Sequence, residues 1–246
     1  MIDTHAHLTS LDDAEEAIER AAEAGVTRIL TVGTDVEDCR RALELAGKHD
    51  GVYAILGIHP HSADTATDTD LAALGNLLGH PKAVAVGETG LDWYRDYAPR
   101  DDQRRLFAAQ LELAGELEKP AVIHTRAADD DTLAGLADFA GTVVLHCFSS
   151  PRLLPTALER GWYVSFAGNA TFPKAVDLRL AATQVPADRI LAETDSPYLA
   201  PQPVRGRRNE PANVVHTVAA LARARGEESD ELGRQIEWNA SQCFGL

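Results

Sequence analysis

The segment MIDTHAHLTS, residues 1–10, contains the pattern that decides the fold. Residues 2–5 form a short predicted strand that ends in His5, and His7 follows two positions later. Side chains two apart in an extended strand point to the same side, so His5 and His7 can ligate one ion together. The segment therefore predicts a buried strand that ends in a pair of metal-binding side chains.

Seven further apolar runs follow, and helical patterns fill most of the intervals between them. Residues 12–24, for example, carry apolar side chains at helical spacing until Gly25 ends the pattern. Repeated strand–helix units imply parallel strands, and eight units favour closure into a single (β/α)8 TIM barrel. An open doubly wound sheet is the alternative. The predicted strands are 2–5, 28–32, 52–58, 83–87, 121–124, 143–146, 163–166 and 190–193.

Length and composition fit one such domain over residues 1–246. No apolar run approaches the length of a membrane span, and the N-terminus lacks a secretory signal. The three cysteines are odd in number and lack metal-finger spacing, which is typical of reduced thiols. We therefore expect a cytoplasmic protein without a membrane partner.

Polar residues of one chemical type gather at the ends of these runs. Five of the nine histidines end or closely follow a predicted strand, and the carboxyl ends of barrel strands share one face. Each residue alone has an ordinary structural interpretation, but together they favour a site for two divalent cations, since imidazole and carboxylate are the usual ligands. Glu88 is central enough to bridge the two ions. The candidate ligands are His5, His7, Glu88, His124, His146 and Asp195.

Other chemistries fit less well. Cys147 lies beside His146, but adjacent strand residues face opposite ways. No nucleophile elbow surrounds Ser196, and no phosphate-binding or dinucleotide loop is present.

The net charge of −15 disfavours nonspecific adsorption to nucleic acid. A nucleic-acid substrate would need a local cationic patch or bound metal ions. The irregular stretch 199–211 offers Arg205, Arg207 and Arg208, which either bind phosphate or pair with surface carboxylates.

The motifs together resemble the TatD family of metal-dependent deoxyribonucleases, within the amidohydrolase-like group. The matching segments are IDTHAHL (2–8), GIHPH (57–61), GETGLDWYRD (87–96), KPAVIHTR (119–126), VVLHCFSS (143–150), ETDSPYLAP (193–201) and RGRRNEPANV (205–214). The resemblance implies phosphodiester hydrolysis by a two-metal-activated water, typically on single-stranded DNA from the 3′ end. RNA and aminoacyl-tRNA are substrates of some relatives.

The resemblance also implies roles by position. One metal would be held by His5, His7, Glu88 and Asp195, and the other by Glu88, His124 and His146. His61 and Arg126 would contact substrate phosphate. Glu88 and Asp195 would be catalytic, with Asp195 accepting a proton from the attacking water.

The identity of the metal, the class of function and the protein partners stay open at this point. The metal is Mg²⁺, Mn²⁺ or Zn²⁺. A hydrolase of small esters or amides, and a non-catalytic barrel that binds a partner, remain alternatives to a nuclease. The Arg-rich loop favours the nuclease, and the intact ligand set disfavours the non-catalytic barrel. Protein partners are not predicted.

Overall fold

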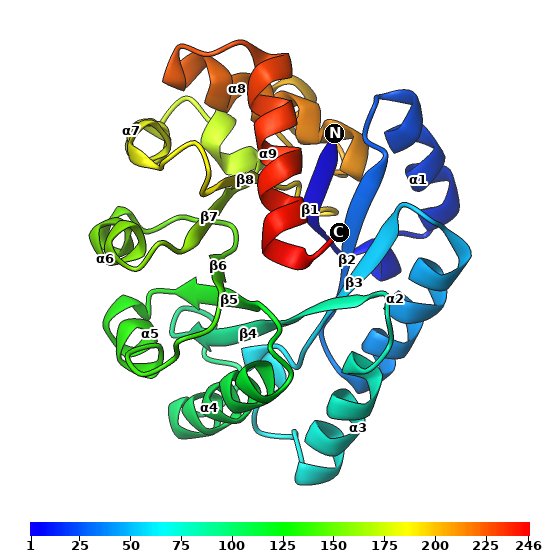
Figure 1. The fold of residues 1–246 in the computed structure, drawn as a ribbon, viewed down its shortest axis with the longest axis vertical. Helices are drawn as coiled ribbons and strands as arrows, with labels where there is room; N and C mark the ends of the chain where they lie inside the picture. Colours follow the sequence, from blue (N-terminus) through cyan, green and yellow to red (C-terminus); the bar gives the residue numbers. More distant parts are fainter. The chain divides into compact units, whose positions relative to one another are not determined.

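The computed structural model describes all 246 residues. The chain divides into two compact units, one formed by Met1–Thr31 with His146–Leu246 and the other by Val32–Leu145. Figure 1 labels the elements in both units.

The eight strands follow one another in chain order within one sheet, from β1 to β8. Every strand pair within a unit is parallel. A doubly wound sheet reverses its strand order at an internal point, so that alternative is wrong and the predicted barrel class is confirmed. The strands are β1 (Ile2–Ala6), β2 (Arg28–Gly33), β3 (Val52–Leu56), β4 (Ala83–Asp92), β5 (Ala121–Arg126), β6 (Val143–Leu145), β7 (Tyr163–Phe166) and β8 (Ile190–Ala192).

In the first unit, backbone hydrogen bonds join the end of β1 to the segment after β8. The N–H of Asp195 donates to the carbonyl of His5 at 2.9 Å, and the N–H of His7 donates to the carbonyl of Ser196 at 2.8 Å. Helix α9 packs against β1 and β8, as Figure 1 shows. The longer helices here are α1 (Ala14–Glu23), α6 (Leu154–Glu159), α7 (Val176–Gln184), α8 (Val214–Arg225) and α9 (Ser229–Phe244).

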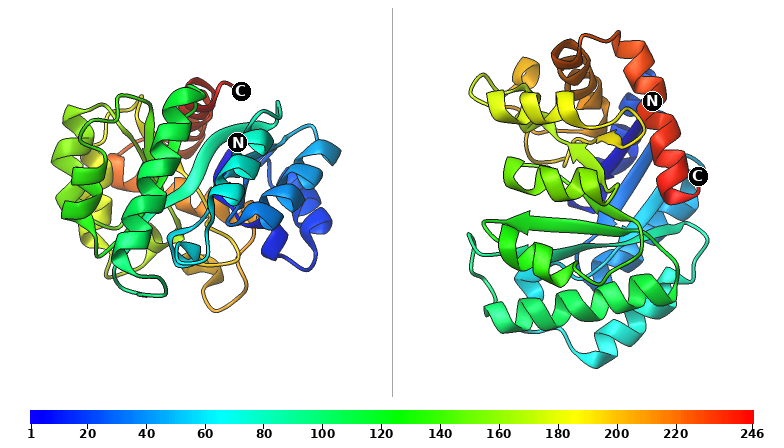
Figure 2. Two further views of the ribbon diagram at one scale, coloured as in Figure 1. Left: turned by 90° about the horizontal axis from the view of Figure 1, so that it is seen from below. Right: turned by 60° about the vertical axis from the view of Figure 1, so that its left-hand side comes forward.

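In the second unit, β4 is longer than the sequence predicted. It continues past 83–87 to Asp92, because its last residues pair with β5: Gly90 lies opposite His124, and Asp92 lies opposite Arg126. Glu88 therefore lies within β4 and does not follow it. Helix α4 packs along this strand (Figure 2). The helices of this unit are α2 (Val36–Lys48), α3 (Asp68–Leu78), α4 (Arg100–Glu116) and α5 (Asp129–Gly135).

The strands are buried on both sides. All five residues of β1 and all ten residues of β4 are buried. This two-sided burial explains the continuous apolar run at residues 83–86 of β4, where an alternating pattern would mark a strand with one face in solvent. It also means that a polar residue within a strand is removed from bulk water. None of the helices has both the length and the apolar character needed to cross a membrane.

Gly90 permits the close approach of β4 and β5 beside His124. Its φ is +140°, a conformation that residues with a Cβ rarely adopt, and an added Cβ would collide with the carbonyl oxygen of His124. The pairing that places His124 therefore depends on this glycine.

We expect Gly90→Ala to lower the free energy of unfolding by about 3 kcal/mol, from backbone strain and overpacking. Gly47→Ala is the matched control, because nothing lies within 4 Å of its Cβ position in α2. This control should stabilise by about 0.5–1 kcal/mol. Urea unfolding of both variants measures the difference, and equal stabilities would contradict the close-approach argument.

Candidate metal centre

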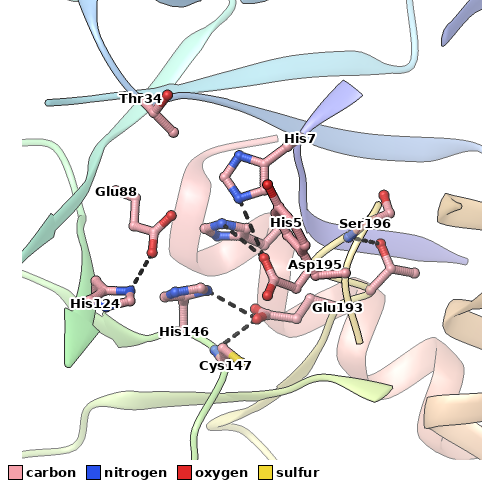
Figure 3. Close-up of polar contacts among 12 residues, drawn as sticks. His5, His7, Thr34, Glu88, His124, His146, Cys147, Glu193, Asp195 and Ser196 are labelled. Carbon is pink, nitrogen blue, oxygen red and sulfur yellow. Dashed lines mark hydrogen bonds and ion pairs between the residues drawn. The ribbon is translucent and has the colours of Figure 1, made fainter. Parts of the chain in front are cut away.

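The first unit brings together four of the predicted ligands, which we name the first cluster: His5, His7, His146 and Asp195. The rings of His5 and His146 stack with centroids 4.0 Å apart. Nε2 of His7 lies 3.4 Å from Oδ1 of Asp195, and His5, His146 and Asp195 can direct ligand atoms at one point. Figure 3 shows these side chains converging.

Local backbone geometry produces this convergence. His5 is the fourth residue of β1, and His7 follows the strand. Asp195 adopts a left-handed conformation, with φ of 55°, where its N–H bonds to His5. The short loop after β8 therefore turns a carboxylate back toward the histidines at the end of β1.

The histidines also determine the charge of Asp195. Burial alone would raise the pKa of this carboxyl, but a hydrogen bond from His7 and the nearby charge of His7, His146 and His5 hold its pKa below the usual range. Asp195 is therefore a carboxylate at neutral pH.

A buried glutamate that the sequence analysis assigned no role supports the first cluster. Oε1 of Glu193 accepts a hydrogen bond from the N–H of Cys147 at 2.7 Å and lies 3.1 Å from Nδ1 of His146. Its Oε2 accepts from the hydroxyl of Ser165 at 2.5 Å. Glu193 is the last residue of the predicted strand 190–193. Its position in the sequence did not show whether it contacts the site or is an ordinary surface charge.

The second unit forms a second cluster from His59, Glu88 and His124, whose ligand atoms can meet at one point. Nδ1 of His124 lies 2.6 Å from Oε1 of Glu88. Nε2 of His59 lies 3.5 Å from the same oxygen. Glu88 and His124 are predicted ligands, and the structure brings them together.

His59 and His61 have different surroundings. Burial lowers the pKa of His59 to about 4, so its ring is neutral, as a metal ligand must be. Nε2 of His61, which the resemblance places in contact with substrate, lies 2.9 Å from Oδ2 of Asp92. The motif GIHPH contains both histidines, and nothing in its spacing favours the first of them as a ligand.

Asp92 is the second buried carboxylate that the sequence analysis missed. Its Oδ2 also bonds to Nε2 of His124 at 3.2 Å, and its Oδ1 accepts from the backbone N–H groups of Tyr94 and Arg95. Burial opposes its charge, but the bonds from His124, Arg95 and His61 outweigh burial and hold the pKa of Asp92 below its usual range.

The arginines predicted to bind substrate are exposed, but three of them have partners within the chain. Arg208 pairs with Asp12 at 2.7 Å and also donates to the carbonyl of Ser10. The guanidinium of Arg205 lies 4.0 Å from the ring centroid of Phe172. That of Arg126 lies 4.1 Å from the ring centroid of Tyr94. Arg207 is exposed on the same irregular stretch as Arg205 and Arg208.

The donor atoms of both clusters are imidazole nitrogens and carboxylate oxygens, and no cysteine takes part. This donor set suits first-row divalent cations. The three cysteines form no disulfide, as predicted.

Comparison with known proteins identifies the family. The family model described as "TatD related DNase" matches residues 2–245. The chain belongs to the TatD family. The "Uncharacterized metal-dependent hydrolase TatD" of Mycobacterium tuberculosis is 40% identical over 100% of this chain and 98% of its own length. The "3'-5' ssDNA/RNA exonuclease TatD" of Erwinia billingiae is 38% identical over 100% of this chain and 99% of its own.

A solved TatD structure agrees with the fold. The TatD homolog YJJV from Escherichia coli K12 superposes with a TM-score of 0.94 at 31% identity, covering 100% of this chain and 98% of that chain. The resemblance predicted from the sequence motifs is therefore confirmed. The TatD family members named above include a metal-dependent hydrolase and a nuclease, and the chain is a hydrolase of this family with clusters of residues able to hold a metal.

Gln103 holds Asp92 in place. Its Oε1 accepts from the backbone N–H of Asp92 at 2.8 Å, and its Nε2 donates to the carbonyls of Ala98 at 2.9 Å and Asp92 at 3.3 Å. Gln103 is fully buried, so water does not reach the backbone groups that it bonds.

We expect Gln103→Leu to lower the free energy of unfolding by about 2 kcal/mol or more, since it leaves buried backbone groups without partners. Gln184→Leu on the exposed side of α7 is the control and should change stability by less than about 0.5 kcal/mol. Urea midpoints measure both effects. A Gln103→Leu protein as stable as its control would show that these bonds contribute nothing.

Proposed function

We propose that the chain is a 3′–5′ exonuclease that hydrolyses single-stranded DNA, with RNA as a second substrate. The observation that carries the proposal is that imidazole and carboxylate groups able to hold a metal gather in each unit, at or near the carboxyl ends of parallel strands except for Glu88, which lies within β4. The name of the Erwinia relative, a 3′–5′ exonuclease of single-stranded DNA and RNA, supports the substrate class.

We further propose that residues 1–246 act as one domain with a two-metal centre. One ion would be held by His5, His7, Glu88 and Asp195, and the other by Glu88, His124 and His146, so that Glu88 would serve both. Four imidazoles and two carboxylates match the preferences of Mn²⁺ and Zn²⁺, and abundant Mg²⁺ is the third candidate.

Divalent ions bound here would make a coordinated water more acidic and neutralise charge on the phosphate. Asp195, which is ionised at neutral pH, accepts the proton of the attacking water. His61 and Arg126 bind phosphate oxygens and orient the scissile bond.

The exposed arginines after β8 provide local positive charge on a chain of net charge −15. Arg207 is the first candidate for a phosphate contact. The pair of Arg208 with Asp12 is exposed and contributes little stability, so phosphate can replace Asp12 as its partner. Arg205 completes the set. A free single-stranded end can reach a site at the ends of barrel strands, whereas a closed duplex cannot.

Elemental analysis and calorimetry should find two divalent ions per chain in the wild type. We expect Glu88→Ala to weaken both sites and to abolish nuclease activity, since the shared carboxylate is lost. Glu112→Ala, which removes an exposed carboxylate from α4, is the control and should leave metal content unchanged. Full activity of the wild type in EDTA would contradict the proposal.

Wild-type protein should degrade end-labelled single-stranded DNA faster than duplex DNA. We expect Arg207→Ala to raise KM and to reduce the log–log salt slope of binding by about 0.7 for the lost phosphate contact. Arg40→Ala on α2 is the control, because it changes net charge equally but lies in an ion pair with Glu37. Metal content should be unchanged in both variants.

Two results would overturn the substrate assignment. Equal rates on closed circular duplex and linear single strands would exclude a preference for free ends. A higher rate on small esters or aminoacyl-tRNA would make the chain a hydrolase of those substrates instead.

A further inference from the structure

The loop between β4 and α4, residues 93–99, carries two exposed tyrosines that the proposed metal centre does not use. Tyr94 is 65% exposed and Tyr97 is 60% exposed. A large aromatic ring left in water forgoes the free energy that its burial would contribute. Two such rings three positions apart on one loop therefore point to a surface that a ligand covers.

The loop is anchored at both ends. At its start, the N–H of Trp93 donates to the carbonyl of Arg126 at 2.9 Å, and Nε1 of Trp93 donates to Oδ2 of Asp131 at 2.8 Å. At its end, the carbonyl of Ala98 accepts from Nε2 of Gln103 at 2.9 Å. A loop that is already held in this way loses little further conformational freedom when it binds a ligand.

Each tyrosine contacts one of the two side chains proposed to bind phosphate in this unit. The guanidinium of Arg126 lies over the ring of Tyr94, 4.1 Å from its centroid. The ring centroids of His61 and Tyr97 are 4.7 Å apart, with an angle of 76° between the ring planes. An aromatic ring therefore accompanies each proposed phosphate contact, and a nucleotide likewise joins a phosphate to an aromatic base.

Both contacts leave a ring face for a second partner. The guanidinium of Arg126 covers one face of Tyr94, and the ring is still more than half exposed. The edge-to-face contact between His61 and Tyr97 covers at most one face of Tyr97. A planar group can therefore stack on either tyrosine without displacing the side chain that already contacts it.

We propose that Tyr94 and Tyr97 are stacking positions for the bases of a single-stranded substrate. The base of the nucleotide whose phosphate contacts Arg126 stacks on Tyr94, and the base of the nucleotide whose phosphate contacts His61 stacks on Tyr97. The inference rests on the proposed nuclease function and adds to it the side chains that hold the bases. Such stacking accepts every base, because each base has a π-face. Bases in a duplex are already stacked on one another, so these contacts also favour single strands.

A purely structural role for the tyrosines makes a different prediction. If Tyr94 only oriented Arg126, loss of its ring would slow the hydrolysis of every phosphodiester substrate by the same factor. If Tyr94 stacks on a base, the loss must disappear on a substrate that lacks a base at that position. An abasic nucleotide separates the two roles, since it keeps the sugar and the phosphate.

The experiment compares kcat/KM for two 5′-labelled single-stranded oligonucleotides in Mn²⁺, from the initial loss of the full-length strand. One is made of thymidines, and the other has stable abasic nucleotides at its three 3′-terminal positions. The wild type should prefer the thymidine strand by roughly 5- to 150-fold for each stack. Tyr94→Ala and Tyr97→Ala should each lose that factor on the thymidine strand, mainly through KM, and should change by less than about twofold on the abasic strand.

Two kinds of control accompany these variants. Tyr94→Phe and Tyr97→Phe keep the aromatic ring and should behave as the wild type on both strands. Trp238→Ala removes a ring of similar exposure, 62%, from α9 and should leave kcat/KM unchanged on both strands.

Each outcome supports or overturns the inference. Equal losses on both strands in Tyr94→Ala and Tyr97→Ala would overturn it, because the rings would then act only through Arg126 and His61. Equal kcat/KM of the wild type on the two strands would overturn it as well and leave the nuclease function intact. This wild-type comparison stands even where a variant does not fold. Wild-type protein that cleaves neither strand would overturn the proposed function and the inference with it.

Discussion

The burial of imidazole and carboxylate groups at the ends of strands is the constraint on which the rest of this molecule depends. An ionised group taken out of water costs several kcal/mol unless hydrogen bonds or opposite charges replace the lost solvation. Asp92 meets this cost with hydrogen bonds from two histidines and two backbone N–H groups. The buried side chain of Glu193 accepts hydrogen bonds from Cys147 and Ser165 and contacts His146.

Asp3 shows how the same constraint ties the strands together. It accepts bonds from the hydroxyl and the N–H of Thr194, at 2.5 and 2.8 Å, so it joins β1 to the segment after β8. Burial raises its pKa to about 8 despite these bonds. The histidines of the first cluster are thus placed by a network of buried groups that hydrogen-bond to one another. Removing one group leaves its partner buried without a hydrogen bond.

The sequence predicted the parts of the molecule that depend on regular patterns. The eight strands, their order and the positions of His5, His7, His124 and Asp195 near strand ends follow from apolar runs alternating with helical spacing. The extension of β4 was not predictable, because four of the five residues 88–92 are polar or small and their pairing with β5 keeps them in a strand.

The two buried carboxylates that contact histidines, Asp92 and Glu193, were equally unpredictable from the sequence. Nothing in the sequence distinguishes Asp92 or Glu193 from solvated charges, since their role arises from contacts with histidines 32 and 47 positions away. The arginines illustrate the same limit: the partner of Arg208 is Asp12, 196 positions distant. Residue type and local spacing identify candidate ligands at strand ends, whereas the groups that contact those candidates are defined only by long-range packing.

The central claim is that the clustered histidines and carboxylates bind divalent metal for hydrolysis. Anomalous diffraction from crystals soaked in Mn²⁺ tests this claim most directly. The account predicts two anomalous peaks per chain, one contacted by His5, His7 and Asp195, the other by His124 and His146, with Glu88 contacting both. A single peak remote from these residues, or no peak in crystals of protein that still degrades DNA, would contradict it.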